Sequence, residues 1–362
     1  MTGQNMKVCV LGGGGREHAL RHALARTATL VDHTDDADLV VVGPDQMVVD
    51  GVADRLRGEG RLVFAPGADG GRLEGSKAWM KEVLLVAGIP TARHGVFTDV
   101  EEALEFLKSM AAPYVVKTDG LAAGKGVLVT GSLADAADDV AAKLSGAAFG
   151  PAGRTVVIEE GLAGPELSVL AVCNGRDFAL LPAARDHKRL GEGDTGPNTG
   201  GMGAYSPVPG TDGLDVAEVI DRTLAELIRR GIDYRGVLYA GFILTDDGPK
   251  VLEYNVRFGD PEAQAVLPRL TSDLAELLAA AAAGRSLPVV TVSADAAVTV
   301  ALAAAGYPAE ARAGDVIAGV EEAEALDGVL VFRAAATVEP GGRMVTGGGR
   351  ELHVTALAPT LP

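Results

Sequence analysis

The segment Val115–Val129, with the sequence VVKTDGLAAGKGVLV, decides the fold that we expect for this chain. Two β-branched runs flank a loop of three glycines and two alanines, with Lys117 at its entrance and Lys125 at its tip. Such a loop can close over a polyphosphate, because its amides and ammonium groups neutralise charge in a partly dry site. It is not a P-loop, since no Gly-Lys-Ser/Thr opens a helix. A flexible hairpin with solvated lysines is the alternative interpretation.

Composition limits the classes of protein to consider. The chain has 362 residues, 48 of them glycine, and a formal charge of −17, which indicates two or three domains and disfavours nucleic acid as a partner. Cys9 and Cys173 lie in apolar runs, so neither a disulfide framework nor a thiolate metal site is expected. No apolar stretch approaches the length of a membrane span, and the start lacks a secretion signal. We therefore expect a cytoplasmic protein with no membrane partner.

The first 70 residues alternate short apolar runs with helix-like segments, which predicts a small doubly wound, Rossmann-like unit. The Gly12–Gly15 turn lies between a strand and a helix, where backbone N–H groups can hold an anion; a tight turn without a ligand is the alternative. Glu17 occupies the third glycine position of the dinucleotide fingerprint, which disfavours a nicotinamide-dependent oxidoreductase. Residues 28–38 (ATLVDHTDDAD) are barely long enough to supply a second strand.

The remainder of the chain predicts an α+β region and a β-rich end. Leu73–Ala87 has helical spacing and ends at Gly88, and Ala217–Arg230 predicts another helix. Turn signals at Asn174-Gly175 and Asp246-Asp247-Gly248 predict hairpins. Residues 285–362 read as short strands with glycine-rich turns.

Three further segments carry groups suited to nucleotide chemistry. The apolar run Val156–Leu162 ends in acidic residues that suit an adenine amino group and ribose hydroxyls, although a solvated strand end would look the same. The polar, glycine-rich stretch 186–207 is long for a loop without function. Glu253 and Asn255 share one face of a strand and offer the oxygen ligands that Mg²⁺ prefers. Arg257 continues that face, with a structural salt bridge as its alternative role.

These segments occur in the order of a known family. In sequence they are GGGREHAL, LEGSKAWMK, VVKTDGLAAGKGVLV, VIEEGLAGPELS, DHKRLGEGDTGPNTGGMGAYSP, LEYNVRFGDPEAQ, AAGYP and VTGGGRELHVTAL. From about Met6 to Leu357 the chain resembles the phosphoribosylamine–glycine ligases (glycinamide ribonucleotide synthetases) of purine biosynthesis, which are ATP-grasp carboxylate–amine ligases. The resemblance implies an α/β and α+β multidomain protein with an ATP-grasp fold. Its expected parts are a Rossmann-like domain at 1–70, an ATP-grasp domain at 71–275 with a lid at about 92–162, and a β-rich domain at 276–362.

The resemblance also implies an activity. ATP, with Mg²⁺ or Mn²⁺, would phosphorylate the carboxylate of glycine, and an amine such as phosphoribosylamine would displace phosphate to leave an amide. The enzyme would be a monomer or homodimer. The expected catalytic residues are Arg257, Lys117 and Lys125. Residues expected to bind ATP are Lys77, Lys117, Gly124, Lys125, Gly126, Glu159, Glu160, Leu162 and Glu166. The expected metal ligands are Glu253 and Asn255. Residues expected near the amino acid or the phosphate of the amine are Asp186, Lys188, Asn198 and Gly201, and Gly14, Gly15 and Arg16.

The chain also departs from the family pattern. Residues 28–38 stand where the family has a second strand and a Pro-Gly-Asn loop, and the chain stops soon after VTAL, without the usual closing helices and strand. Two other functions therefore stay open. One is a diverged amide ligase of a specialised pathway, with a different amine or amino acid. The other is a nucleotide-binding protein without turnover, which the joint presence of Lys117, Glu253, Asn255 and Arg257 disfavours.

Overall fold

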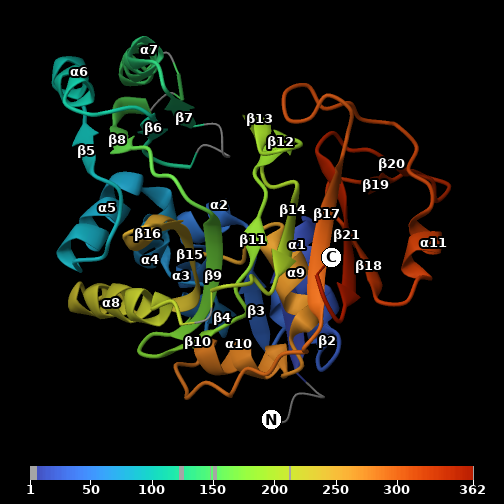
Figure 1. Ribbon diagram of the computed structural model, residues 1–362. Helices are drawn as coiled ribbons and strands as arrows, with labels where there is room; N and C mark the ends of the chain where they lie inside the picture. Colours follow the sequence, from blue (N-terminus) through green and yellow to red (C-terminus); the bar gives the residue numbers. More distant parts are fainter. Residues whose placement is uncertain (1–5, 122–125, 147, 150–152, 212, 362) are drawn as a thin grey trace.

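The computed structural model describes residues 6–121, 126–146, 148–149, 153–211 and 213–361. Gly124 and Lys125, at the tip of the expected lid loop, lie outside these described residues. Within them the strands form four larger sheets and two two-stranded ribbons. Figure 1 shows one sheet with its helices as a separate lobe at the upper left, and the C-terminal sheet on the opposite side.

The N-terminal sheet is parallel, with the strand order β2-β1-β3-β4. It consists of β1 (Lys7–Leu11), β2 (Thr29–Leu30), β3 (Leu39–Val42) and β4 (Val63–Phe64). Its connections include the helices α1 (Gly15–Leu24), α2 (Asp45–Val49) and α3 (Val52–Gly58). All four residues of β3 are buried, as expected for a parallel strand covered on both faces. The predicted doubly wound arrangement is thus confirmed.

The expectation that residues 28–38 are barely long enough for a second strand is confirmed. Residues 28–38 do supply a second strand, because Thr29 and Leu30 pair in parallel with Lys7 and Val8. A 3₁₀ turn, η2 (Thr34–Asp36), then returns the chain to β3. Two residues of pairing are enough here because the strand lies at the sheet edge and needs only one neighbour.

The predicted helix Leu73–Ala87 is in fact two helices, α4 (Ala68–Gly75) and α5 (Lys77–Val86). Ser76 between them is extended, with φ −141° and ψ 110°, and its hydroxyl accepts a hydrogen bond from the Trp79 N–H at 3.1 Å. Serine is a preferred N-cap, so the chain can end one helix and start another without leaving donors unsatisfied. The break places Lys77 at the first turn of α5.

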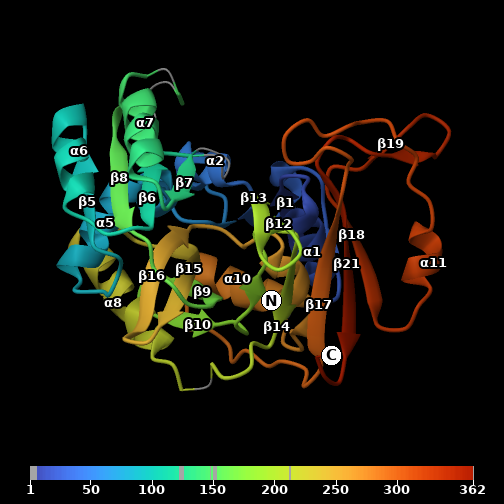
Figure 2. The same cartoon turned by 45° about the horizontal axis from the view of Figure 1, so that its top comes forward.

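The upper lobe in Figures 1 and 2 is an antiparallel sheet with two helices and its own apolar core. Its strands, in the order β5-β8-β6-β7, are β5 (His94–Phe97), β6 (Tyr114–Thr118), β7 (Val127–Thr130) and β8 (Val156–Glu160). Its helices are α6 (Val100–Lys108) and α7 (Leu133–Leu144). The predicted loop is therefore the β6–β7 connection, and its flanking strands pair in the register Lys117 opposite Val127.

The central sheet is antiparallel, with the order β10-β9-β15-β16. It contains β9 (Glu166–Asn174), β10 (Phe178–Leu180), β15 (Arg235–Thr245) and β16 (Gly248–Asn255), so both predicted hairpin turns are confirmed. Helices α5 and α8 (Val216–Arg229) pack on one face and α10 (Leu274–Ala282) on the other. Both cores also include residues of β1 and β3, so the central and N-terminal sheets are packed together.

The C-terminal sheet has the order β11-β14-β17-β21-β18. Its strands are β11 (Arg185–Asp186), β14 (Gly203–Ser206), β17 (Ala296–Ala303), β18 (Val329–Arg333) and β21 (Arg350–Ala358). The ribbons are β12 (Arg189–Gly191) with β13 (Thr195–Asn198), and β19 (Thr337–Val338) with β20 (Met344–Val345). Short helical segments are α9 (Glu262–Val266), η4 (Leu267–Arg269) and α11 (Val320–Glu324).

The domain boundary near residue 275 stays a prediction, and it does not coincide with a sheet edge. Strands β11 and β14 precede it in the sequence, yet β14 pairs with β17 after it. The stretch 186–207 is thereby held by the C-terminal sheet, and its ribbon β12–β13 lies between the upper lobe and that sheet in both views. Among the described residues, no helix is both long and apolar enough to cross a membrane.

Candidate active site

The end of β16 presents the three polar residues that the sequence placed on one face. Tyr254, Val256 and Phe258 are buried in the core, and Glu253, Asn255 and Arg257 alternate with them. The Arg257 guanidinium donates from Nη2 to Asn255 Oδ1 at 3.0 Å. An acid, an amide and a guanidinium therefore lie side by side at one edge of the central sheet.

Glu74 holds Arg257 in place, although the sequence analysis did not identify Glu74 as a site residue. Its Oε1 is 2.7 Å from Arg257 Nη2, and its Oε2 accepts the Val256 N–H at 2.8 Å. Burial raises the pKa of Glu74, which Arg257 and the Val256 N–H oppose. Since 183 residues separate the two partners, no local pattern could have shown the pair. The salt bridge considered for Arg257 exists, and its Nε has no hydrogen-bond partner among the described residues.

A second charged cluster lies where β6, β8 and α5 meet. Lys117 Nζ lies 2.9 Å from Glu159 Oε1, and Lys81 Nζ lies 3.0 Å from Glu159 Oε2. Glu159 is 1% exposed. Burial alone would raise its pKa, but the two lysines hold it below its usual range. The expectation that Glu159 lines an adenosine pocket is thereby corrected, because both of its oxygens face ammonium groups.

The other expected adenosine residues follow Glu159. The Glu160 carboxylate accepts the Arg93 N–H at 2.9 Å, and Leu162 is half-buried just beyond β8. No contact of either residue decides their role, so their binding of adenosine stays a prediction.

Lys77 lies at the entrance of the β6–β7 loop. Its Nζ donates to the Gly120 carbonyl at 2.9 Å, and Asp119 accepts the Ala78 N–H at 3.1 Å. At the far end of the loop, the Gly126 carbonyl accepts the Thr118 N–H at 2.8 Å. Burial lowers the pKa of Lys77. The loop therefore starts against Lys77 and ends against Thr118, the residue that follows Lys117.

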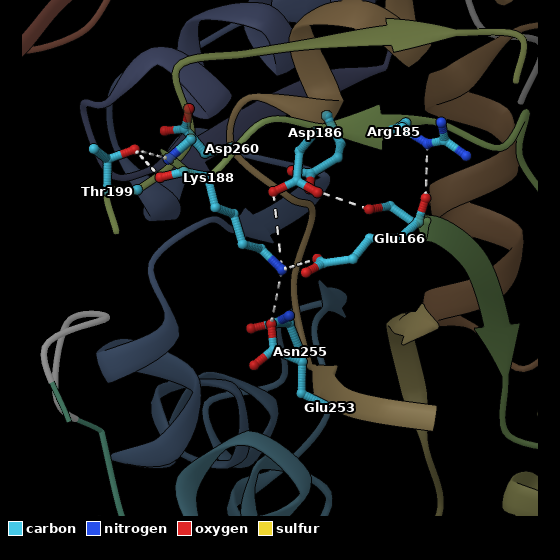
Figure 3. A network of polar contacts seen from close by, with 12 residues as sticks. Glu166, Arg185, Asp186, Lys188, Thr199, Glu253, Asn255 and Asp260 are labelled. Atoms are coloured by element: carbon cyan, nitrogen blue, oxygen red, sulfur yellow. Dashed lines mark hydrogen bonds and ion pairs between the residues drawn. The ribbon is translucent and has the colours of Figure 1, made fainter. Parts of the chain in front are cut away.

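Figure 3 shows a network centred on Lys188, with Asp186 and Glu166 on one side and Glu253 on the other. The Lys188 Nζ lies 2.7 Å from Glu166 Oε2, 3.8 Å from Glu253 Oε1 and 3.9 Å from Asp186 Oδ2. Burial raises the pKa of Asp186 to about 7, although Lys188 opposes the rise. The structure thus brings together residues expected for nucleotide, metal and amino acid.

Glu253 and Asn255 can supply part of a metal site. Glu253 is acidic here, because Lys188, Lys117 and Lys77 outweigh burial and keep the pKa of its carboxyl below the usual value. Among the described residues, no three His, Cys, Asp or Glu side chains converge to hold an ion. Two hard oxygen donors without a third suit a cation whose other ligands are phosphates and water, as is usual for Mg²⁺.

In the Gly12–Gly15 turn, a side chain from the following helix, Glu17 of α1, contacts the backbone of the turn. Glu17 folds back so that Oε2 accepts the Gly14 N–H at 2.7 Å, while Oε1 lies 2.7 Å from Arg16 Nε. A Cβ placed on Gly43 would lie 2.2 Å from Glu17 Oε1, so both turns approach this carboxylate closely. Arg16 also donates to the Phe258 carbonyl at 3.3 Å, which joins the turn to the end of β16.

The C-terminal sheet adds groups that the sequence had not indicated. Arg350 donates to the Gly200 and Gly201 carbonyls at 2.7 and 3.0 Å, and its Nη2 lies 3.3 Å from Asp260 Oδ2. Gly201 has φ +107°, and a Cβ there would come within 2.4 Å of Pro261, so only glycine fits. The GGGREL motif carried the resemblance but gave no sign of these contacts.

His353, on β21, lies beside the glycine turn, since a Cβ on Gly15 would come within 2.7 Å of His353 Nδ1 and of Gln264 Nε2. Asn198 is exposed on β13, opposite Arg189. Its predicted place near the amino acid stays a prediction.

His353 should make the fold sensitive to acid. It is 0% exposed, and burial lowers its pKa to about 4, with Asp260 opposing and Arg350 adding to the change. Because an unfolded histidine titrates near 6.5, the unfolded state binds more protons between these values, and the free energy of unfolding falls as the pH falls through them. We expect a loss of up to about 3 kcal/mol from pH 7 to pH 4.

Urea unfolding at several pH values measures this loss. His353→Asn should flatten the curve between pH 6.5 and 4. The pKa values of His18 and His22 are also lowered, mainly by burial, and remain in both proteins as the shared background. An unchanged slope in the variant would contradict the assignment.

Comparison with known proteins agrees with this arrangement. Residues 75–263 match the family model of the phosphoribosylglycinamide synthetase ATP-grasp (A) domain, and residues 297–362 match that of its C domain. A phosphoribosylamine–glycine ligase of Brucella melitensis is 43% identical over 396 residues, covering 98% of this chain and 91% of that protein. The Streptomyces coelicolor ligase is 46% identical over 390 residues, covering 97% and 91%.

Solved structures give the same result. The phosphoribosylamine–glycine ligase of Thermotoga maritima superposes with a TM-score of 0.84 at 35% identity, covering 98% of this chain and 93% of that one. The biotin carboxylase domain of 2-oxoglutarate carboxylase from Hydrogenobacter thermophilus, a complex with MgADP and bicarbonate, shares the fold at a TM-score of 0.71 and 17% identity, with 98% and 86% coverage. The expected ATP-grasp fold is confirmed, and the chain belongs to the phosphoribosylglycinamide synthetase family.

Proposed function

We propose that this chain is an ATP-dependent ligase that joins the carboxylate of glycine to the amine of phosphoribosylamine. The observation that carries the proposal is the meeting of Glu253, Asn255 and Arg257, at the end of one strand, with the Lys188 network and with Lys77 and Lys117 at the entrance of the β6–β7 loop. The relatives named phosphoribosylamine–glycine ligase support the same substrates. As an ATP-grasp enzyme it would release ADP and phosphate.

The proposed reaction has two chemical steps, and in each step one bond forms and one bond breaks. A glycine carboxylate oxygen attacks the γ-phosphorus of ATP, and the bond from that phosphorus to ADP breaks. The amine nitrogen then attacks the acyl carbon, the carbon–oxygen bond to phosphate breaks, and the nitrogen loses a proton. The acyl phosphate between these steps hydrolyses if water enters, so the site has to close over it.

The cationic residues have separate roles in this proposal. Lys77 and Lys117 neutralise the triphosphate from the lid side, together with the loop tip Gly124–Gly126. Arg257, held by Glu74, stabilises charge that develops on the transferring phosphoryl group. Glu253 and Asn255 hold a divalent cation, for which Mg²⁺ is our first choice and Mn²⁺ the alternative. When bound, that ion polarises the phosphate oxygens.

The substrates occupy the two sides of this strand end. Glu160, Leu162 and Glu166 face the adenosine, although Glu166 already binds Lys188 through one oxygen. Residues near the amino acid are Asp186, Lys188, Asn198 and Gly201. Residues near the phosphate of the amine are Gly14, Gly15 and Arg16.

Release of ADP tests the proposal. We expect ADP only when glycine, freshly generated phosphoribosylamine and ATP with Mg²⁺ are all present. Turnover with glycine and a different amine, but not with phosphoribosylamine, would instead establish a diverged ligase. A trap with hydroxylamine detects acyl phosphate independently of the acceptor. The absence of both ADP release and hydroxamate, with any amino acid and amine, would contradict ligase activity altogether.

A further inference from the structure

Lys81 is a buried charge for which the proposed reaction has no direct use. It lies in α5, one helical turn after Lys77, and is 0% exposed. Its Nζ donates to Thr91 Oγ1 at 2.7 Å and lies 3.0 Å from Glu159 Oε2. A cation enclosed in this way cannot touch a ligand, so any role in the reaction has to act through a neighbour.

The neighbour is Glu159, which two lysines share. Its other oxygen lies 2.9 Å from the Nζ of Lys117, the lysine at the entrance of the lid loop. Thr91 in turn donates to the Val251 carbonyl of β16 at 2.6 Å. Lys81 therefore connects α5, the sheet of the upper lobe and β16, the strand that carries Glu253.

The net charge of this group differs from that of a simple pair. Glu159 with Lys117 alone would be neutral, and the field at the triphosphate would come from a dipole. With Lys81 the three groups carry one net positive charge, at the lid end of the site. Buried ion clusters often contribute little to stability compared with apolar side chains of similar size, so a role in stability alone explains the arrangement poorly.

We propose that Lys81 is a positioning residue that compensates the charge of Glu159, so that Lys117 keeps its positive charge for the ATP phosphates. The inference rests on the proposed function only in assuming that the nucleotide binds at Lys117. Burial lowers the pKa of Lys81 to about 8, and Lys117 adds to the change, whereas Glu159 and, from β16, Glu253 favour the charged form that prevails at pH 7.

Calorimetric titration with ATP and Mg²⁺ tests the proposal on the full chain. Lys81→Met should weaken ATP binding about tenfold, because one net charge near the phosphates is lost in a medium of moderate dielectric constant. The double variant Lys81→Met with Glu159→Gln should bind within about threefold of the original chain, since its net charge is again +1. Glu159→Gln alone should bind ATP at least as tightly as the original chain.

Lys143→Met is the matched control. Lys143, on α7, is also a buried lysine, 1% exposed; it pairs with Asp139 and donates to the Val116 carbonyl of β6 at 3.2 Å, without contact to Glu159 among the contacts of the described residues. We expect the Lys143→Met variant to be less stable than the original chain and to bind ATP with the same affinity. Thermal unfolding of every variant separates binding from folding.

Two results would contradict the proposed role of Lys81. A folded Lys81→Met chain that binds ATP normally would overturn the inference, and so would a double variant no better than the single one. If Lys81→Met does not fold, weaker binding by Glu159→Gln would still overturn it. ATP binding is measured without glycine or amine, so it does not depend on the proposed reaction. If the variants show the expected order of ATP affinities but the chain forms no amide, only the proposed function is contradicted.

Discussion

Arg257→Ala should lower the turnover number for glycine-dependent ADP formation by about 10³-fold, while the Kd for ATP changes by less than about threefold. Arg257 is held from two sides, by Glu74 Oε1 at 2.7 Å and Asn255 Oδ1 at 3.0 Å, so its position is set before substrate binds. A cation fixed in this way stabilises charge that appears only in the transition state. Its loss should therefore appear in kcat and leave ground-state nucleotide binding largely intact.

Two variants separate the charge of Arg257 from its position. Arg257→Lys keeps the charge but loses the planar guanidinium, whose Nη2 donates to Glu74 and Asn255 and whose Nη1 donates to the Phe258 carbonyl, so we expect it to recover only part of the activity. Glu74→Gln keeps Arg257 and its charge but weakens the pair, and should lower kcat less than Arg257→Ala. Turnover within tenfold of the original in a folded Arg257→Ala chain would remove Arg257 from the mechanism.

The residues that the sequence located well lie within a few positions of one another. Glu253, Asn255 and Arg257 share a face because a strand has a period of two, and this follows from sequence alone. The loop between β6 and β7 is likewise local, since two apolar runs around a glycine-rich turn form a hairpin.

The residues that it missed act through distant partners. Glu74 meets Arg257 across 183 residues, and Arg350 meets Gly200 across 150. Glu159 was expected to bind adenosine because it is next to Glu160 at the end of a strand. Side chains alternate between the two faces of β8, however, and the Glu159 side chain lies on the face where Lys81 and Lys117 contact it. Its partners come from α5 and β6, so only the packing of α5 against the sheet of the upper lobe could show where the Glu159 side chain points.

The positive charge needed to bind ATP is concentrated at the site, although the chain as a whole is negatively charged. A protein with a formal charge of −17 cannot attract ATP by its overall field. The site instead places Lys77, Lys117 and Arg257 around one strand end. Glu74 and Glu159, their acidic partners, are buried and fix the cations rather than facing the ligand.

Glu253→Gln should have the second large effect, a fall in kcat of about 10²-fold or more together with weaker binding of Mn²⁺ to the complex with ATP. The carboxylate contributes the charge of the proposed metal site, and Asn255 contributes only a neutral oxygen. The change keeps size and hydrogen bonding but removes the charge. Electron paramagnetic resonance of Mn²⁺ measures the affinity directly and needs no turnover.

Two controls keep this result interpretable. Asp247→Asn removes an exposed carboxylate at the turn before β16 and should alter neither property; its side chain is 87% exposed. Lys188→Met removes the cation 3.8 Å from Glu253 Oε1 without touching the proposed ligands. Because Lys188 is itself proposed to lie near the amino acid, the comparison uses Mn²⁺ affinity and not turnover: if Glu253 held only Lys188, Mn²⁺ affinity would change in neither variant. Weaker Mn²⁺ binding in Glu253→Gln, with equal or tighter binding in Lys188→Met, is the outcome that a metal ligand requires, because removing a neighbouring cation favours a second one.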